Sequence, residues 1–166
     1  MKKLIFISLL SLLLACNRTE QAPKASATPE PSAATSQASQ AQEVAISEAW
    51  VRATALGQSV GAAYMTLTSP QDSTLVYVES AAANEVQIHS MRMDKGVMKM
   101  RMLEALPLKA STPEKLAPGG FHLMLFDLTK PLTAGEGVTF KLCFKDSKGN
   151  ITHQDVMLPI MEEAPK

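Results

Sequence analysis

The sequence predicts an all-β fold, either a β-sandwich or a small Greek-key barrel. From about Glu43 to Ile160, short apolar or alternating runs recur at short intervals. Turn-forming residues separate these runs, and no long stripe of apolar residues at helical spacing accompanies them. Hydrophobic residues make up 46% of the chain and aromatic residues only 5%, so the core must be mainly aliphatic.

Several segments have the composition and alternation of strands. They are Val44–Arg52, Gly61–Thr68, Ser73–Ser80, Glu85–Ser90, Val97–Met102, Leu106–Leu108, Phe121–Leu128, Val138–Phe144 and Ile151–Leu158. Turn signals separate them at residues 69–72, 93–96, 118–120 and 146–150. The run Ala81–Ala83 could form one helical turn at most.

Residues 1–15 predict a lipoprotein signal peptide. Two lysines precede an apolar run from Leu4 to Leu14, which is too short to span a bilayer and typical of an export signal. The segment Leu13–Cys16 resembles the lipobox of bacterial lipoproteins, which implies cleavage before Cys16 and acylation of that residue. The alternative is an ordinary signal peptide with a chance cysteine.

Residues 16–42 contain the acylated cysteine and a predicted disordered tether rich in Ala, Ser, Pro and Gln. About 26 residues of flexible chain have a root-mean-square reach of ~30 Å. Asn17, where inner-membrane lipoproteins carry Asp, resembles an outer-membrane sorting signal. We therefore expect a domain anchored on the periplasmic side of the envelope, with the outer membrane favoured over the inner.

Five of the ten methionines fall in one segment, residues 91–102, close to His89. The polar turn at Asp94–Gly96 predicts a hairpin. A four-residue loop, Met93–Gly96, would place His89 opposite Met100 on one face. A three-residue loop would put the two side chains on opposite faces.

A second His–Met pair lies in Phe121–Leu128. Alternation places Leu123 and Leu125 on one face of this strand and His122 and Met124 on the other. Two imidazoles and two thioethers form a donor set that favours Cu(I). Thioethers also avoid the disulfide formation to which thiolates are prone in an oxidising compartment.

The candidate metal ligands are His89, Met100, His122 and Met124. Each of these residues, taken singly, is more often structural than a ligand. Ten residues separate His89 from Met100, 21 separate Met100 from His122, and one separates His122 from Met124. This spacing matches the motif of the periplasmic copper chaperones that serve the Cu(A) centre of cytochrome c oxidase, the PCu(A)C family.

The flanking sequence also resembles that family, over most of Val44–Leu158. The similar runs are Ala49–Ala53, Ala62–Thr66, Val86–His89, Gly96–Arg101 and Pro118–Met124. The resemblance implies a cupredoxin-like Greek-key β-sandwich in residues 43–160 and a periplasmic carrier of one Cu(I). It also implies delivery to oxidase subunit II or to a Sco-type partner.

Two features depart from the family pattern. Many members are free periplasmic proteins, whereas this chain carries a predicted anchor and tether. Some members have a His- and Met-rich tail that takes Cu(II), but the C-terminal tail here, residues 161–166, is short and lacks histidine.

Other residues have structural interpretations with functional alternatives. Met91, Met93, Met98 and Met102 form either an apolar rim around the copper or a docking patch with transient ligands. Cys143 is read as a small semi-buried residue rather than a reactive thiol. Trp50 is expected in the core or at its rim, and His153 on the surface.

Other functions account for some of these sequence features. The alternative is an envelope protein that buffers copper, or confers resistance to it, without a dedicated client, because an anchored protein could sequester the metal locally. An enzyme is not expected, because no blue-copper cysteine accompanies the ligands and one remaining thiol cannot form an internal dithiol. A structural lipoprotein without metal would leave the spacing unexplained. The formal net charge is zero and the chain has no basic stripe, so nucleic acid is not an expected partner. We also expect the protein to be a monomer.

Overall fold

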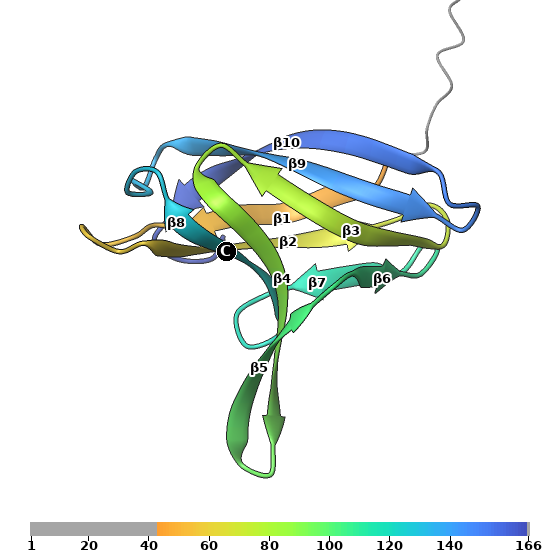
Figure 1. Cartoon of the computed structure of the whole chain (residues 1–166), viewed down its shortest axis with the longest axis horizontal. Helices are drawn as coiled ribbons and strands as arrows, with labels where there is room; N and C mark the ends of the chain where they lie inside the picture. Colours follow the sequence, from red (N-terminus) through yellow and green to blue (C-terminus); the bar gives the residue numbers. More distant parts are fainter. Residues whose placement is uncertain (1–42, 166) are drawn as a thin grey trace, which may run out of the picture. The chain divides into compact units, whose positions relative to one another are not determined.

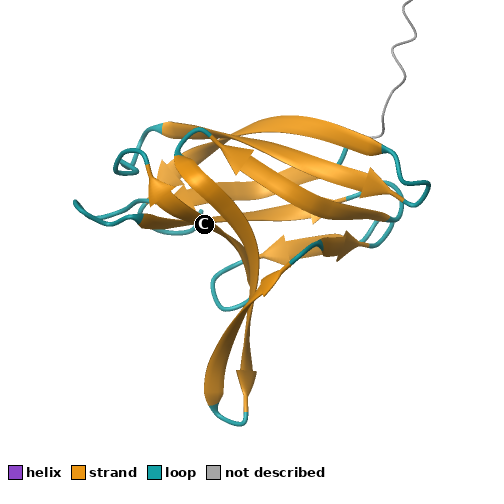
Figure 2. Cartoon of the chain, viewed as in Figure 1, coloured by secondary structure: helices purple, strands orange, loops and turns teal. Residues whose placement is uncertain are grey.

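Ten β-strands make up the part of the chain that the structure, a computed structural model, describes: residues 43–165 (Figures 1 and 2). They are β1 (Ala45–Arg52), β2 (Val60–Thr68), β3 (Ser73–Ser80), β4 (Ala83–Asp94), β5 (Val97–Leu103), β6 (Leu106–Leu108), β7 (Pro113–Leu116), β8 (Phe121–Leu128), β9 (Gly137–Asp146) and β10 (Ile151–Met161). None of residues 43–165 belongs to a helix long and apolar enough to cross a membrane. The predicted signal peptide, Cys16 and the tether lie outside the described residues.

The strands form one continuous sheet that folds into two facing layers. Its order is β5-β4-β8-β7-β2-β1-β10-β9-β3-β6. β1 joins the layers by pairing in parallel with β10, with Val51 beside Ile160. β8 lies between β4 and β7 and also pairs with β2. The all-β prediction is confirmed.

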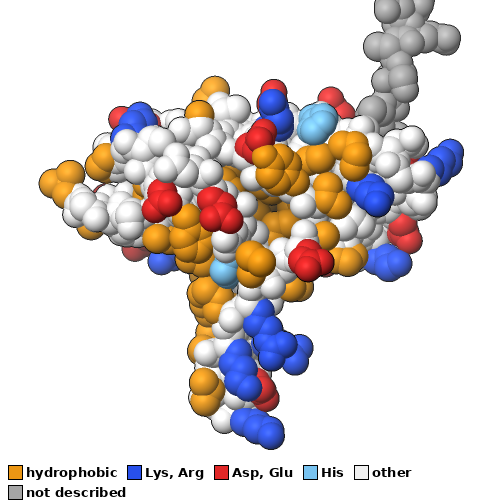
Figure 3. Space-filling model, in the orientation of Figure 1, with side chains coloured by type: hydrophobic (Ala, Val, Ile, Leu, Met, Phe, Trp, Pro, Cys, Tyr) orange, Lys and Arg blue, Asp and Glu red, His pale blue; other side chains and the backbone are white. Residues whose placement is uncertain are grey.

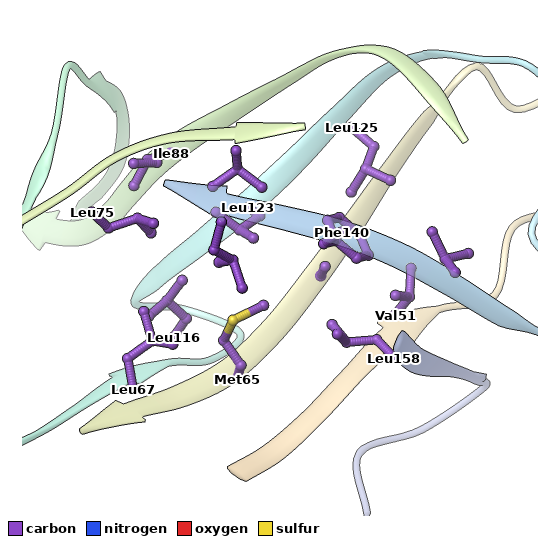
Figure 4. Close-up of a cluster of buried hydrophobic side chains, with 14 of the residues drawn as sticks. Val51, Met65, Leu67, Leu75, Ile88, Leu116, Leu123, Leu125, Phe140 and Leu158 are labelled. Atoms are coloured by element: carbon purple, nitrogen blue, oxygen red, sulfur yellow. The ribbon is translucent and has the colours of Figure 1, made fainter. Parts of the chain in front are cut away.

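A mainly aliphatic core fills the space between the layers (Figure 4). Leu123 and Leu125 from β8 meet Phe140 and Leu142 from β9, and all four are completely buried. This packing follows from alternation, because every second residue of each strand points inward. The residues between them on β8 therefore point to the outer face of the sheet.

The clearest differences from the expected strands are at β4 and β7. β4 starts at Ala83, so no helical turn forms there, and it continues to Asp94. β7, at Pro113–Leu116, was not predicted, because Leu116 is its only buried residue and the run has no apolar alternation. Its partner β2 supplies the pairing that makes it a strand.

The distal half of β4 and nearly all of β5 extend away from the sandwich as a protruding hairpin (Figure 1). β4 pairs with β8 from Ala83 to Ser90 and with β5 from Ile88 to Asp94. The two pairings overlap only at Ile88–Ser90. His89, inside this overlap, therefore lies where the hairpin meets the sandwich.

We expect Phe140→Ala to lower the free energy of unfolding by about 3–5 kcal/mol, because the side chain is fully buried and its loss leaves a cavity. Urea unfolding of the wild-type and variant proteins measures this change. Leu56→Ala, at a side chain that is 92% exposed, is the control and should have little effect. Equal losses in both variants would contradict the position of the core.

Candidate metal centre

A row of rings crosses the outer face of the sheet and ends at two histidines. Trp50 on β1 lies 4.7 Å from Tyr64 on β2, centroid to centroid. Tyr64 lies 6.5 Å from His122 on β8, and His122 lies 5.9 Å from His89 on β4. The guanidinium of Arg52 sits 5.8 Å from the centroids of both the Trp50 and Tyr64 rings. Ring packing and the Arg52 guanidinium thus hold Trp50 and Tyr64 in place.

Strand register brings the two histidines together. His89 and His122 are directly opposed in the antiparallel pairing of β4 with β8. Directly opposed residues share a face, with Cβ atoms about 5 Å apart. Both side chains are buried, with exposed fractions of 9% and 5%. The neighbouring Ile88 and Leu123 point the other way, into the core.

A chain of hydrogen bonds orients the His89 ring. The amide nitrogen of Gln87 donates to the Glu85 carboxylate at 2.8 Å, so the amide oxygen Oε1 faces His89. That oxygen lies 2.7 Å from His89 Nε2, which must therefore donate its proton. The neutral ring then carries its lone pair on Nδ1.

This His89 Nδ1 atom is buried and has no hydrogen-bond partner. A buried polar atom without a partner is uncommon in folded proteins, since leaving it unpaired costs about 1–3 kcal/mol. Its position beside a second imidazole makes it a candidate for metal coordination. A metal ion would use the lone pair that the protein leaves unpaired.

The His122 ring is oriented by the opposite nitrogen. His122 Nδ1 lies 3.0 Å from the carbonyl oxygen of Gly120, which can only accept. The same carbonyl accepts from the backbone N–H of Met91 at 2.9 Å, fixing the turn against β4. The lone pair of His122 is thereby left on Nε2. A backbone carbonyl that holds one imidazole nitrogen in this way is a common support for metal-ligating histidines.

Burial lowers the pKa of His89, and the neighbouring His122 lowers it further. A lowered pKa keeps the imidazole neutral to a more acidic pH than for an ordinary histidine. Only the neutral ring can donate a lone pair to a metal. His89 is consequently a better ligand at mildly acidic pH than an exposed histidine would be.

The hairpin has a shorter loop than the sequence led us to expect. Asp94 pairs with Val97, so the turn contains only Lys95 and Gly96, with φ of 53° and 79°. Two successive positive φ values are typical of a type I′ turn, whose twist matches that of the strands. The predicted four-residue loop was therefore wrong.

The shorter loop shifts the register by two positions. His89 is opposite Met102, and Met100 is opposite Met91. Because side chains alternate with a period of two, a shift of two positions keeps the same residues on the same face. Met100 thus shares the face of His89, but as a diagonal neighbour, at a Cα separation that long side chains still span.

The four predicted ligands are brought to one face from three strands. Met124 on β8 is opposite Gln87 and half-buried. Met100 on β5 is 45% exposed, and Met102 is 57% exposed. Within residues 43–165, no three His, Cys, Asp or Glu side chains cluster closely enough to hold a metal ion. Beyond the two histidines, the soft donors on this face are thioethers.

Some residues that shape this site were not identified from the sequence. They are Tyr64, Gln87 and Phe126, and the ring centroid of Phe126 lies 6.1 Å from that of His89. Gln87 could have been identified, because it lies two positions before His89 on the same strand. Tyr64 depends on long-range pairing, which a local pattern does not reveal.

Two further residues lie away from the site. Cys143 is buried on β9, opposite His153 of β10, and burial raises the pKa of its thiol. It is a free cysteine, and the raised pKa makes it a poor nucleophile. His153 is exposed, as expected.

The protein matches a family model described as "Putative lipoprotein LpqE-like" over residues 44–157. It is also 32% identical over 117 residues to "Putative lipoprotein Lxx21020" of Leifsonia xyli subsp. xyli (strain CTCB07). That alignment covers 70% of each chain.

Solved structures share the fold. The Cu(I) form of DR1885 from Deinococcus radiodurans is 28% identical, with a TM-score of 0.56 over 78% of this chain and 86% of that one. The apo form of DR1885 is 27% identical, with a TM-score of 0.53 over 92% and 100% of the two chains. A copper-bound PCuAC domain from PmoF2, 24% identical over 71% and 93%, has a TM-score of 0.54 and supports the fold alone.

We expect Gln87→Leu to release the His89 ring from its single tautomer, because the acceptor for Nε2–H is removed. Nitrogen NMR of the metal-free protein should show protonated Nε2 at His89 in the wild type and mixed tautomers in the variant. His122, held by Gly120, should keep its tautomer and serves as the internal reference. An unchanged His89 spectrum would contradict the hydrogen-bond chain.

Proposed function

This chain belongs to the LpqE-like family of lipoproteins, and from that premise we propose that it is a copper chaperone of the bacterial envelope. It binds one Cu(I) through His89, Met100, His122 and Met124. The observation that carries this proposal is the unpaired, buried Nδ1 of His89 beside the His122 ring. An orphaned lone pair in such a place is accounted for by a metal ion.

The donor set explains the choice of ion. Neutral imidazoles suit several transition metals, whereas thioethers select soft ions such as Cu(I). All four donors are neutral, so the bound ion keeps its charge of +1 and no thiolate is exposed to oxidation. The Cu(I) form of DR1885, which is 28% identical, supports copper as the cargo.

The arrangement also allows release. The histidines lie on paired strands of the sandwich and are buried, so they hold the ion in a fixed place. Met100 lies on the hairpin and is nearly half exposed. A donor from an acceptor protein can replace this thioether first, so that copper is never released to water.

We place the domain on the periplasmic side of the envelope, attached through acylated Cys16. Several acyl chains on one residue hold a protein far more firmly than a single chain. The tether of residues 17–42 would let the domain search for partners within ~30 Å of the membrane. The outer membrane is the favoured location, from Asn17.

The expected result of a Cu(I) titration against a competing chromophoric chelator, under anaerobic conditions, is one tight equivalent in the full chain in detergent. Replacing His89, Met100, His122 and Met124 by leucine should abolish tight binding, because both imidazoles and the two thioethers nearest to them are removed. His153→Leu combined with Met157→Leu removes the same residue types elsewhere, and should leave binding intact. Tight one-to-one binding that survives in the quadruple variant would overturn the ligand assignment.

The client we propose is the Cu(A) centre of cytochrome c oxidase, reached through subunit II or a Sco-type protein. The alternative is copper buffering without a client, which the membrane anchor supports. Neither role makes the protein an enzyme.

A deletion strain distinguishes the two roles. Delivery predicts loss of oxidase activity at low copper that is restored by added copper, because the client then loads without help. Buffering predicts a normal oxidase and growth inhibition at high copper. Oxidase activity and growth measured in the same strain decide between them, with the quadruple variant as the complementation control.

A further inference from the structure

A ladder of methionine pairs runs along the protruding hairpin beyond the histidines. Met91 is opposite Met100, and Met93 is opposite Met98. Both pairs share the face of the His89–Met102 pair, because they are two and four positions along the same strands. Thioethers thus continue from the proposed copper site to the turn.

The pairing type brings these side chains close together. In a hairpin with a two-residue loop, the residues flanking the turn, Asp94 and Val97, form a hydrogen-bonded pair. Hydrogen-bonded and non-hydrogen-bonded pairs then alternate along an antiparallel ladder. The methionine pairs fall in the second class, in which Cα atoms are only ~4.5 Å apart and the side chains are closer. Each pair can direct two sulfurs at one ion.

Exposure separates these methionines from those that fill a core. Met93 is 61% exposed and Met98 is 51% exposed, whereas Met65 in the core is 1% exposed. Apolar side chains at a protruding tip gain nothing from burial within this chain. Their sulfurs are accessible to a dissolved ion.

We propose that Met91, Met93, Met98 and Met100 form a second soft-cation site, a station for Cu(I) between the histidine pair and the hairpin tip. This inference rests on the proposed function, since it deepens the path by which the same cargo leaves. Successive pairs on one face are ~7 Å apart, so Met100 belongs to both stations. The ion would move by exchanging one neutral thioether for another, with no change of charge or oxidation state and no proton transfer.

The charge of the hairpin makes this second site weaker than the first. Arg92, Lys99 and Arg101 lie on the opposite face of the hairpin, and Lys95 lies in the turn. Figure 3 shows Lys and Arg side chains gathered along one side of the hairpin. Only Asp94, which pairs with Lys99, offsets them. Exposed charges repel a cation modestly, because water and salt screen them, so the site is suited to transient occupancy.

The test is a titration with Ag(I), a soft ion that does not change oxidation state, into the full chain in detergent with methyl-labelled methionines. Carbon–proton NMR follows each methyl group. The first equivalent should shift the methyls of Met100 and Met124. The second should shift those of Met91, Met93 and Met98, with an affinity at least tenfold weaker.

The matched variant is Met93→Leu with Met98→Leu, which keeps the apolar surface and removes two sulfurs. It should retain the first equivalent and lose the second, with an unchanged circular dichroism spectrum. Met157→Leu, at a methionine that is 73% exposed on β10, is the control and should retain both equivalents.

Two results would overturn the proposal. If the second equivalent persists in the double variant, or if the wild type binds only the first, the proposed tip site is wrong and the chaperone function is unaffected. Absence of both equivalents in the wild type would overturn the chaperone function as well.

Discussion

The pairing of β4 with β8 places His89 opposite His122, and the rest of the proposed metal centre depends on this register. The same pairing turns Ile88 and Leu123 into the core, so burial of these apolar residues holds the histidines in position. A slip of one residue would put leucine on the outer face and histidine in the core. The hydrophobic effect thus specifies the geometry of a polar site that lies on the other face of the sheet.

The site combines a rigid half with an exposed half. Gln87 and the carbonyl of Gly120 orient the two imidazoles, and both rings are buried. The methionines of β5 lie on a hairpin that is hydrogen-bonded to no other strand beyond Ser90. Buried histidines favour retention of an ion, and exposed thioethers favour its exchange. The proposed chaperone function requires both properties.

Most strands, and the face on which each candidate ligand lies, could be predicted from the sequence because both depend on local residue patterns. Alternation in Phe121–Leu128 separates His122 from Leu123, and turn residues delimit most strands. The loop of the hairpin was not predictable with certainty, because Met93–Gly96 and Lys95–Gly96 are both acceptable turns. The face of Met100 was nevertheless predicted, since the two loops differ by two residues in register. β7, Tyr64 and the His89 tautomer depend on contacts between distant segments, which single-strand patterns do not contain.

With a two-residue turn, the number of residues between His89 and Met100 sets the length of the hairpin. The ten residues between His89 and Met100 divide into five on β4, two in the turn and three on β5. If the pairing is kept, a longer hairpin must add residues to both strands and so change this interval. A fixed interval therefore fixes the reach of the tip, about 17 Å of strand beyond His89. If the copper site of an acceptor protein lies at the bottom of a recess, the hairpin tip could reach it only where the recess is no deeper than this length.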